Sequence, residues 1–258
     1  MKKYLKDFKI LEATRHSAGT ALIKLTPEDG EMPSILPGQF VNILVKDCND
    51  VFLRRPISVC DVDYDKCLLT LYIKKVGKGT EHLCAAKPGD VWNLLLPLGN
   101  GFDVEKDNLP SRPLLIGGGV GMAPMLYLGR CLKQKGVAPV FLLGGASEAD
   151  IPLMDLFAEV GETYATTVDG SLGVKGFVTD HTLMADGAYD NIYCCGPTPM
   201  MKAVAAVALR KGIDCEVSLE NRMACGLGAC LCCVEDTTSG HKCVCTDGPV
   251  FDIKSLKW

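Results

Sequence analysis

The stretch RPLLIGGGVGMAPMLYLGRCLKQKG, residues 112–136, decides how the second half of this chain folds. An apolar run leads into a glycine-rich turn, and a segment of helical character follows it directly. Glycines let a backbone approach a ligand closely, and Pro124 falls in the first helical turn, where its missing N–H costs nothing. We therefore interpret Gly118, Gly119 and Gly121 as candidate cofactor-binding residues. A glycine turn with a purely structural role is the alternative, since the spacing departs from strict G-x-G-x-x-G.

The same rhythm of strand, turn and helix continues along the chain. The later pairs are APVFLLGG (138–145) with IPLMDLFAEVG (151–161), TYATTVDG (163–170) with VTDHTLMADG (178–187), and NIYCCGP (191–197) with TPMMKAVAAVALRKG (198–212), before a last strand in DCEVSLE (214–220). Strands that alternate with helices imply right-handed βαβ units and a parallel sheet. The sequence therefore predicts an α/β parallel-sheet nucleotide-binding domain over residues 111–215.

Residues 1–103 have a different sequence pattern, with short β-type runs and no long helical segment. The runs are TALIKLT (20–26), QFVNILV (39–45), CLLTLYIKKV (67–76) and DVWNLLLPLG (90–99). Turn-forming segments such as PEDG and PGD separate them. This spacing predicts an N-terminal antiparallel sandwich or barrel. Residues 216–258 are left as a small cysteine-rich region at the carboxyl end.

The overall composition excludes several classes of protein. The chain has 258 residues, 48% of them hydrophobic and 22% charged, which is typical of a globular protein of one or two domains. A net charge of −4 provides no basic field for a nucleic-acid backbone, so we expect no nucleic-acid partner. No stretch reaches the ~18 apolar residues of a membrane-spanning helix. Because the amino terminus also lacks the apolar core of a secretory signal, we expect a cytoplasmic protein with no membrane span.

Two segments of the β-rich region carry groups that suit phosphate. LRRPISV (53–59) places Arg55 and Ser58 near one spot on a strand, and the planar fork of arginine suits a pyrophosphate. VGKGTEHL (76–83) offers Gly79 and Thr80 just before a short helix, whose free amides could hold phosphate oxygens. A surface arginine pair and a turn with an N-cap threonine are the alternative interpretation.

A second loop of the α/β region repeats the pattern of a ligand site. CCGPTPMM (194–201) follows a strand at its carboxyl end, where ligands of parallel sheets bind. Cys195, followed by Gly196 and Pro197, either lies against a nicotinamide or is a small buried residue. After the strand VFLLGG, the segment ASEAD (146–150) has two carboxylates and no neighbouring Arg or Lys, which favours NADH over NADPH.

Six cysteines lie between residues 225 and 245, in ACGLGACLCCVEDTTSGHKCVC. Cys225, Cys230 and Cys233 have the C-x4-C-x2-C spacing of plant-type [2Fe–2S] ligation, and Cys245 supplies a fourth thiol. Glycines at 226 and 228 permit sharp turns between the ligands. A structural zinc site with four thiolates is the alternative. Cys232 and Cys243 remain, either as alternate ligands or as ordinary packed or free thiols.

Taken together, these segments resemble the ferredoxin reductase family, in which a flavin-binding β-barrel precedes a nicotinamide-binding α/β domain. The resemblance covers essentially the whole chain and implies that FAD is bound by the barrel. It assigns flavin contacts to Arg55-Pro56-Ile57-Ser58, which resembles the motif R-x-[YF]-S, and to Tyr72-Ile73-Lys74 and Gly79-Thr80. Ile57 replaces the usual aromatic residue of that motif.

The cysteine region narrows the resemblance. ENRMACGLGAC with VCTDGPVF is similar to the electron transfer subunits of type B dihydroorotate dehydrogenases, whose four ligands match Cys225, Cys230, Cys233 and Cys245. The resemblance implies electron transfer between NAD, FAD, a [2Fe–2S] centre and a dihydroorotate-oxidising flavoprotein partner in pyrimidine synthesis. The implied assembly is a heterotetramer of two subunit pairs.

Two alternatives from other classes stay open. One is a stand-alone NADH-dependent reductase of ferredoxin, or a subunit of another redox complex. The other is a zinc-stabilised binding module with no redox role. No acid–base catalytic pair stands out in the sequence, so no catalytic residue is predicted. Asp169 and Glu220 are candidates only for lining the cofactors.

Overall fold

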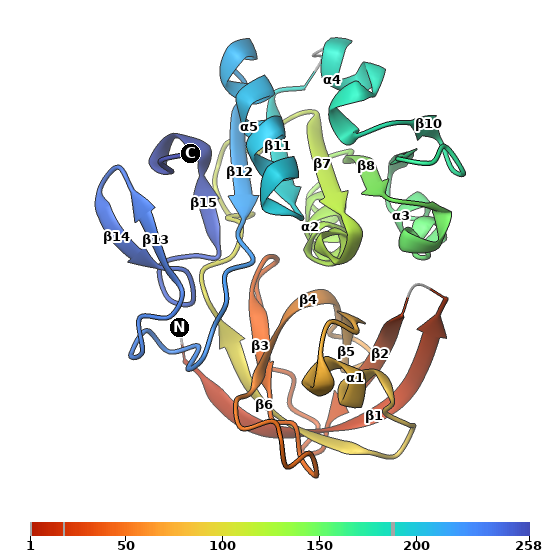
Figure 1. The fold of residues 1–258 in the computed structure, drawn as a ribbon, viewed down its shortest axis with the longest axis vertical. Helices are drawn as coiled ribbons and strands as arrows, with labels where there is room; N and C mark the ends of the chain where they lie inside the picture. The colour runs from red at the N-terminus through yellow and green to blue at the C-terminus, as the bar shows by residue number, and fades with distance from the viewer. Residues whose placement is uncertain (1, 18, 187–188) are drawn as a thin grey trace.

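The computed structural model describes residues 2–17, 19–186 and 189–258. A β-barrel forms one end of the molecule and a seven-stranded sheet with helices on its faces forms the other (Figure 1). A two-stranded hairpin near the carboxyl end lies to one side of both (Figure 1). The predicted combination of an antiparallel barrel, an α/β part with a parallel sheet and a small cysteine-rich part is confirmed. Gly187, at the end of the predicted segment 178–187, lies outside the described residues.

The barrel closes in the strand order β1-β2-β5-β4-β3-β6, and all its pairings are antiparallel. Its strands are β1 (Tyr4–His16), β2 (Thr20–Pro27), β3 (Phe40–Ile43), β4 (Arg55–Asp63), β5 (Leu68–Lys74) and β6 (Val91–Leu98). The one helix of this part, α1 (Lys78–Cys84), follows β5. Each of the four predicted β-type runs forms a strand, whereas β1 was not predicted.

The larger sheet has the order β10-β9-β8-β7-β11-β12-β15, with only β15 antiparallel to its neighbour. Its strands are β7 (Pro113–Gly118), β8 (Val140–Gly145), β9 (Glu162–Thr167), β10 (Val174–Lys175), β11 (Asn191–Cys195), β12 (Asp214–Ser218) and β15 (Val250–Asp252). The α-helices are α2 (Met122–Gln134), α3 (Met154–Ala158), α4 (Thr182–Asp186) and α5 (Thr198–Lys211). Short 3-10 helices are η1 (Gly119–Gly121), η2 (Glu148–Asp150), η3 (Val178–Asp180) and η4 (Ile253–Ser255).

The burial pattern of the strands explains why each half folds as it does. In the barrel, strands such as β2 alternate between the interior and a half-exposed outer face. By contrast, β7 and β11 are buried at every position, because helices cover both faces of a parallel sheet. The continuous apolar run of residues 113–116 therefore belongs at the centre of the sheet, where it lies between β8 and β11.

Helix α2 joins the sheet to the barrel. The buried hydroxyl of Tyr127 donates a hydrogen bond to the carbonyl oxygen of Ile35, at 2.9 Å. On the same helix, Arg130 forms an ion pair with Asp61 of β4, with 2.9 Å between Nε and Oδ2. These two contacts tie helix α2 to the barrel, one through β4 and one through the segment between β2 and β3.

The carboxyl-terminal residues return to both parts of the molecule. After β12 the chain forms the cysteine loop and then the hairpin of β13 (Val234–Thr237) and β14 (Gly240–Cys243). The apolar tail then adds β15 to the edge of the large sheet, beside β12. No helix among the described residues is long and apolar enough to cross a membrane.

Candidate functional site

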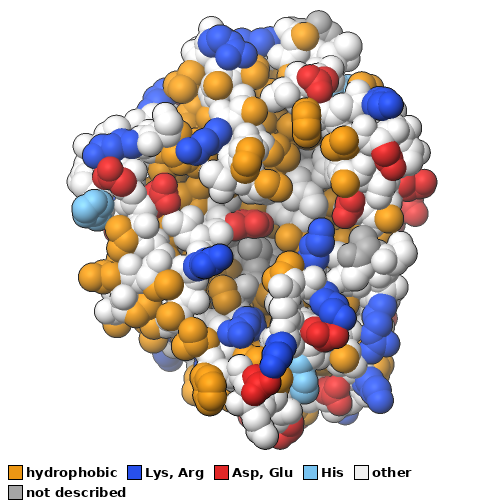
Figure 2. Space-filling view, in the orientation of Figure 1, with side chains coloured by type: hydrophobic (Ala, Val, Ile, Leu, Met, Phe, Trp, Pro, Cys, Tyr) orange, Lys and Arg blue, Asp and Glu red, His pale blue; other side chains and the backbone are white. Residues whose placement is uncertain are grey.

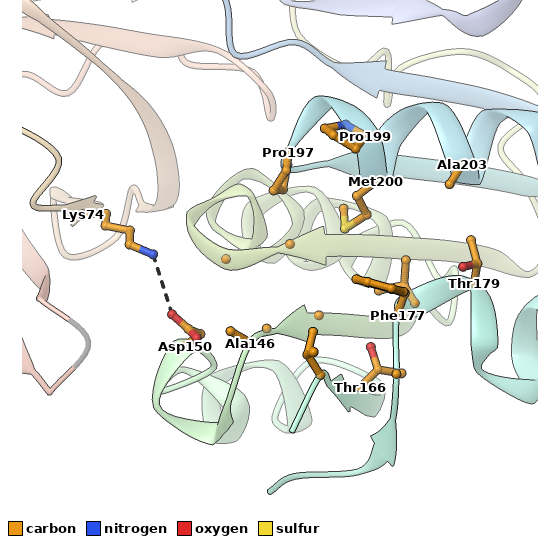
Figure 3. A pocket seen from close by; sticks show the side chains of 17 residues that line it. Lys74, Ala146, Asp150, Thr166, Phe177, Thr179, Pro197, Pro199, Met200 and Ala203 are labelled. Carbon is orange, nitrogen blue, oxygen red and sulfur yellow. Dashed lines mark ion pairs between the residues drawn. The ribbon is translucent and has the colours of Figure 1, made fainter. Parts of the chain in front are cut away.

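A cavity of about 500 Å³ lies at the carboxyl ends of the central parallel strands. Figure 2 shows a hollow near the middle of the molecule, with hydrophobic side chains gathered along its upper rim. Figure 3 shows the side chains that line the cavity. The lining consists of Lys74, Gly118, Gly119, Gly144, Gly145, Ala146, Asp150, Thr166, Val168, Gly176, Phe177, Val178, Thr179, Pro197, Pro199, Met200 and Ala203. Because β7 has its partners β8 and β11 on opposite sides, the cavity lies where parallel sheets bind nucleotides.

The predicted glycines bring two loops into direct contact at this cavity. A Cβ on Gly121 would lie 2.5 Å from the Cα of Gly196 and 2.6 Å from the carbonyl oxygen of Cys195. A Cβ on Gly118 would lie 2.5 Å from the Sδ of Met200. At Gly121 only glycine fits, because the clash would be with backbone, and at Gly118 a larger residue would displace the Met200 side chain. The loop after β7 therefore packs directly against the loop after β11.

A lysine from the barrel reaches this cavity. Lys74, at the end of β5, forms an ion pair with Asp150 of η2, with 3.6 Å between Nζ and Oδ1 (Figure 3). Asp150 also accepts a hydrogen bond from the backbone N–H of Ser147, at 3.2 Å. The segment 146–150 has no cation nearby in the sequence, but the fold places Lys74 beside it.

A second cavity, of about 310 Å³, lies between the barrel and the sheet. Its lining consists of Phe40, Pro56, Ile57, Ser58, Tyr72, Ile73, Lys74, Val76, Thr80, Val120, Ala123, Leu219, Glu220, Asn221, Met223 and Pro249. Seven of the nine residues to which the sequence assigned flavin contacts are in this lining. Lys74 lines both cavities, so the two are neighbours.

The other two residues, Arg55 and Gly79, contact each other. A Cβ on Gly79 would lie 2.5 Å from the Nε of Arg55, so the guanidinium rests on the first turn of α1. The N-cap of α1 is Gly77, which corrects the alternative that placed a threonine there. The hydroxyl of Thr80 lies inside the first turn, where it accepts hydrogen bonds from the N–H groups of Val76 and Gly77, at 2.9 and 3.2 Å.

Cys195 lies next to a residue of the second cavity. Its side chain is fully buried, and its Sγ is 3.8 Å from the Oε1 of Glu220, which lines the second cavity. Burial raises the pKa of Glu220 above its usual value. Burial likewise raises the pKa of the Cys195 thiol. The buried Glu220 carboxyl therefore faces the second cavity next to the Cys195 thiol, and burial favours the neutral form of both groups.

Asp169 has a different role from the one considered in the sequence. Its carboxylate accepts hydrogen bonds from the N–H and the hydroxyl of Ser171, at 2.9 and 2.7 Å, which lower its pKa. These bonds hold the turn after β9. Its neighbour Val168 is the residue of that turn that lines the nucleotide cavity.

The cysteine loop directs backbone amides at three of the four predicted ligands. The N–H of Leu227 donates to the Sγ of Cys225 at 3.3 Å, and the N–H of Gly228 donates to the Sγ of Cys245 at 3.2 Å. The N–H of Cys245 donates to the Sγ of Cys233 at 3.4 Å. Amide donors of this kind stabilise thiolates, the form that binds iron, so the loop fits an iron–sulfur centre.

The pKa values of Cys225 and Cys245 shift in opposite directions from the usual value of a thiol. The amide of Leu227 lowers the pKa of Cys225 to about 6. Burial raises the pKa of Cys245 to about 12. Coordination to a metal cation would offset this shift, because a coordinated thiol is deprotonated. As the side chains lie, the described residues contain no group of three or more His, Cys, Asp or Glu able to hold one metal ion.

The loop conformation depends on the two predicted glycines, and the remaining cysteines lie beside it. Gly226 and Gly228 have φ angles of +70° and +81°, in the left-handed region that favours glycine. Cys232 is exposed and its Sγ is 3.6 Å from the carbonyl oxygen of Arg222. Cys243 ends β14, where its N–H donates to a carboxylate oxygen of Asp247 at 2.7 Å.

Several residues of the site carry no signal in the sequence. Phe177 and Met200 line the nucleotide cavity, and the Phe177 side chain is 66% exposed. Asn42 of β3 reaches the cysteine loop from the barrel. Phe177 and Asn42 belong to no motif, and Met200 lies in CCGPTPMM (194–201) but was not itself predicted to line the site. An apolar side chain exposed in a turn after a parallel strand is the one feature that could have indicated Phe177.

Two family models match the chain. Residues 220–257 match the iron-sulfur cluster binding domain of dihydroorotate dehydrogenase B. Residues 115–206 match the oxidoreductase NAD-binding domain. The predicted iron–sulfur region and nucleotide-binding region are therefore confirmed.

Solved structures share the fold. A chain of the NADH-dependent reduced ferredoxin-NADP oxidoreductase superposes with a TM-score of 0.86 at 30% identity, covering 97% of this chain and 90% of that one. The ferredoxin reductase of carbazole 1,9a-dioxygenase, at 22% identity, has a TM-score of 0.68 over 83% of this chain and 67% of its own. The second likeness supports the fold alone.

Curated relatives cover most of the chain. The electron transfer subunit of dihydroorotate dehydrogenase B (NAD(+)) from Shouchella clausii is 41% identical over 84% of this chain and 85% of its own length. The subunit of the same name from Bacillus cereus is 43% identical over 84% of this chain and 85% of its own. With the two cavities, the cysteine loop and these relatives together, the chain belongs to the family of dihydroorotate dehydrogenase B electron transfer subunits.

Proposed function

We propose that this chain transfers electrons between NAD and a dihydroorotate-oxidising flavoprotein subunit, by way of FAD and a [2Fe–2S] centre, in pyrimidine synthesis. The observation that carries the proposal is the order of the three sites. The nucleotide cavity adjoins the barrel cavity through Lys74, and the barrel reaches the cysteine loop through Asn42. When bound, FAD exchanges a hydride with the nicotinamide and single electrons with the iron–sulfur centre.

In this proposal the first cavity holds NAD(H). The loop that contains Gly118, Gly119 and Gly121 accepts the pyrophosphate, with open space beside Gly119, where a Cβ would meet nothing within 4 Å. Gly196 and Pro197 form the opposite wall, and Cys195 lies behind it. In this placement Ala146 and Asp150, which line the cavity after β8, would lie beside the adenosine ribose.

The second cavity holds the flavin. Pro56, Ile57 and Ser58 of β4 and Tyr72, Ile73 and Lys74 of β5 form its barrel wall, with Thr80 beyond them. Arg55, held on Gly79, supplies the cation for the FAD pyrophosphate. Glu220 completes the wall on the sheet side, where its buried carboxyl can hold or release a proton near the reacting ring.

The cluster ligands in this proposal are Cys225, Cys230, Cys233 and Cys245. Cys230 is exposed, and the neighbouring side chains of Leu227 and Leu231 are 46% and 63% exposed. Exposed apolar side chains beside a one-electron carrier suit a surface that a second subunit covers. We assign this face to the catalytic flavoprotein subunit.

The finer organisation follows from the same assignment. The chain works within a complex rather than alone, as a heterotetramer of two subunit pairs, in the cytoplasm. The three parts are a flavin-binding barrel (residues 1–103), an NAD-binding α/β domain (111–215) and a cluster-binding region (216–258).

A second candidate function rests on one specific likeness. The 30% identity and TM-score of 0.86 to the NADH-dependent ferredoxin-NADP oxidoreductase chain extend over nearly the whole length. A subunit of another redox complex, or a reductase of diffusing ferredoxin, would use the same three sites. The identity of the electron acceptor separates the two functions.

The test is reconstitution with a partner. The chain is co-expressed with the dihydroorotate-oxidising flavoprotein of the same genome, and dihydroorotate-dependent reduction of NAD+ is followed anaerobically. The proposal predicts that the two chains co-purify and that this activity requires both. Absence of a complex, together with rapid NADH-dependent reduction of ferredoxin by this chain alone, would assign the second function instead.

A further inference from the structure

Strand β3 connects the flavin side of the barrel to the cysteine loop. Side chains alternate along a strand, so Val41 and Ile43 point into the barrel core, where both are fully buried. Phe40 and Asn42 lie on the opposite face. Phe40 lines the second cavity and packs into the core that contains Cys233 and Cys245. Asn42 is the next residue of that face.

Asn42 contacts the loop that carries the first cluster ligand. Its Nδ2 donates a hydrogen bond to the carbonyl oxygen of Cys225, 183 residues away in the chain, at 3.4 Å. A Cβ on Gly226 would lie 2.8 Å from the same Nδ2. The loop backbone therefore presses directly on the Asn42 amide, and the glycine is required both for this approach and for its φ of +70°.

The oxygen of the Asn42 amide has no partner among the residues that the structure describes. The side chain of Asn42 is 1% exposed, and no donor among the described residues reaches its Oδ1. A buried oxygen without a hydrogen bond destabilises the folded state relative to a satisfied one. An apolar side chain of similar size would avoid this penalty, so packing alone does not account for an amide here.

We infer that Asn42 is a positioning residue for the iron–sulfur centre. The amide fixes the Cys225–Gly226 backbone against the barrel strand whose same face lines the flavin cavity. This contact sets the placement of one ligand relative to the flavin, and the dipole of the amide becomes part of the environment of the cluster. The inference rests on the proposed function, because it requires a cluster in the cysteine loop.

The test compares two buried asparagines in the anaerobically purified protein. Asn42→Leu removes the contact with the loop. Asn191→Leu is the matched control, because Asn191 is also buried with an unpartnered Oδ1, but lies at the opposite end of β11 from the cavities. Readouts are the EPR spectrum and midpoint potential of the reduced cluster, the rate of iron release to a chelator, FAD content, and flavin reduction by NADH.

We expect Asn42→Leu to keep its FAD and its rate of flavin reduction, while its EPR spectrum and potential change. Iron release should be about tenfold faster, in line with the loss of an outer contact to a metal ligand. Asn191→Leu should match the wild type in all cluster properties. The inference is overturned if Asn42→Leu has the cluster properties of the wild type, or if both variants change alike.

A second arm keeps the inference testable if Asn42→Leu does not fold. In the otherwise wild-type chain, Gly226→Ala would place a methyl group against the Nδ2 of Asn42. In the Asn42→Ala background that Nδ2 is absent, so the methyl group does not meet it. The effects on iron release should therefore be strongly non-additive, with Gly226→Ala milder in the double variant. Additive effects would overturn the inference. A wild-type chain that binds no iron and sulfide would instead contradict the proposed function itself.

Discussion

Lys74 of the barrel and Asp150 of the α/β part form an ion pair across the two halves of the molecule, at 3.6 Å (Figure 3). Lys74 lines both cavities, and Asp150 lines the one at the carboxyl ends of the parallel strands. The pair therefore places a cation next to the nucleotide site, where its charge is balanced by a carboxylate. A 2′-phosphate bound here would be repelled by the Asp150 carboxylate, which already pairs with Lys74.

This pairing predicts how nucleotide preference can be altered. Asp150→Asn should free Lys74 to pair with a 2′-phosphate, so the ratio of kcat/KM for NADPH to that for NADH should rise about tenfold, the value of one charge-assisted hydrogen bond. The measurement is steady-state reduction of an artificial acceptor with each nucleotide. The gain should disappear in the Lys74→Gln, Asp150→Asn double variant. An unchanged ratio in Asp150→Asn would show that the adenosine ribose does not lie beside this pair.

The contact between the two nucleotide loops predicts a steep penalty at one glycine. Gly121→Ala would push a methyl group onto the Gly196 backbone, which cannot move aside as a side chain can. We expect a loss of about 1–3 kcal/mol in stability, typical of overpacking, together with weaker NADH binding. Thermal unfolding and NADH titration measure the two effects.

Gly119→Ala is the control for that substitution. Gly119 has a φ of +55°, but a Cβ there meets nothing within 4 Å. Its cost should be limited to backbone strain of about 1–2 kcal/mol, with a smaller effect on NADH affinity than Gly121→Ala. Equal NADH affinities in the two variants would argue against close packing of the two loops as the basis of the site.

The buried carboxyl of Glu220 predicts a dependence of stability on pH. Because burial raises its pKa in the folded state, the folded protein holds this proton at a pH where the unfolded chain has lost it. The stability contributed by the protonated carboxyl is therefore present below the unfolded pKa, and it is lost as the pH rises through the folded pKa. Glu220→Gln should match the wild type in acid and exceed its Tm toward neutral pH.

Thermal unfolding from acid to neutral pH measures this difference. Glu28→Gln, on an exposed turn, serves as the control for the loss of one carboxylate outside the site. A Tm difference between Glu220→Gln and the wild type that stays constant over the range would mean that Glu220 titrates alike in the folded and unfolded chain.

Two neighbouring exposed cysteines give a test of ligand assignment. Cys230→Ser should remove electron transfer to the acceptor while leaving reduction of the flavin by NADH intact, because the flavin cavity has no residue from the loop 225–233 in its lining. Cys232→Ser should behave as the wild type. Stopped-flow absorbance separates the two steps. Loss of flavin from Cys230→Ser would mean that the loop is structural for the barrel.

Much of the fold could be predicted because its signals are local. The glycine turn after a continuous apolar run identified the central strand β7, and alternation with turn formers identified most barrel strands. Strand β1 gave no such signal, because only two of its thirteen residues are buried and its exposed positions mix charged residues with Leu5 and Leu11. Strand β15 has three residues and forms by pairing with β12, so no local pattern in the sequence indicates it.

The site could be predicted only where a motif carries its chemistry. The spacing of Cys225, Cys230 and Cys233 reflects ligation by a compact cluster, so the sequence itself contains it. The positions of Lys74 beside Asp150 and of Asn42 beside Cys225 depend on how the barrel packs against the rest of the chain. Contacts of this kind join residues far apart in the sequence, and periodicity or spacing does not reveal them.

Anaerobic titration of the purified chain with NADH tests the central claim most directly, with visible absorbance and EPR recorded at each addition and iron, sulfide and FAD quantified. The account predicts about two irons, two sulfides and one FAD per chain, since the four thiols hold one [2Fe–2S] centre. NADH should bleach the flavin bands and then produce the EPR signal of a reduced cluster. A preparation without iron or acid-labile sulfide, or one whose flavin is reduced while an intact cluster stays oxidised, would contradict electron transfer through this chain.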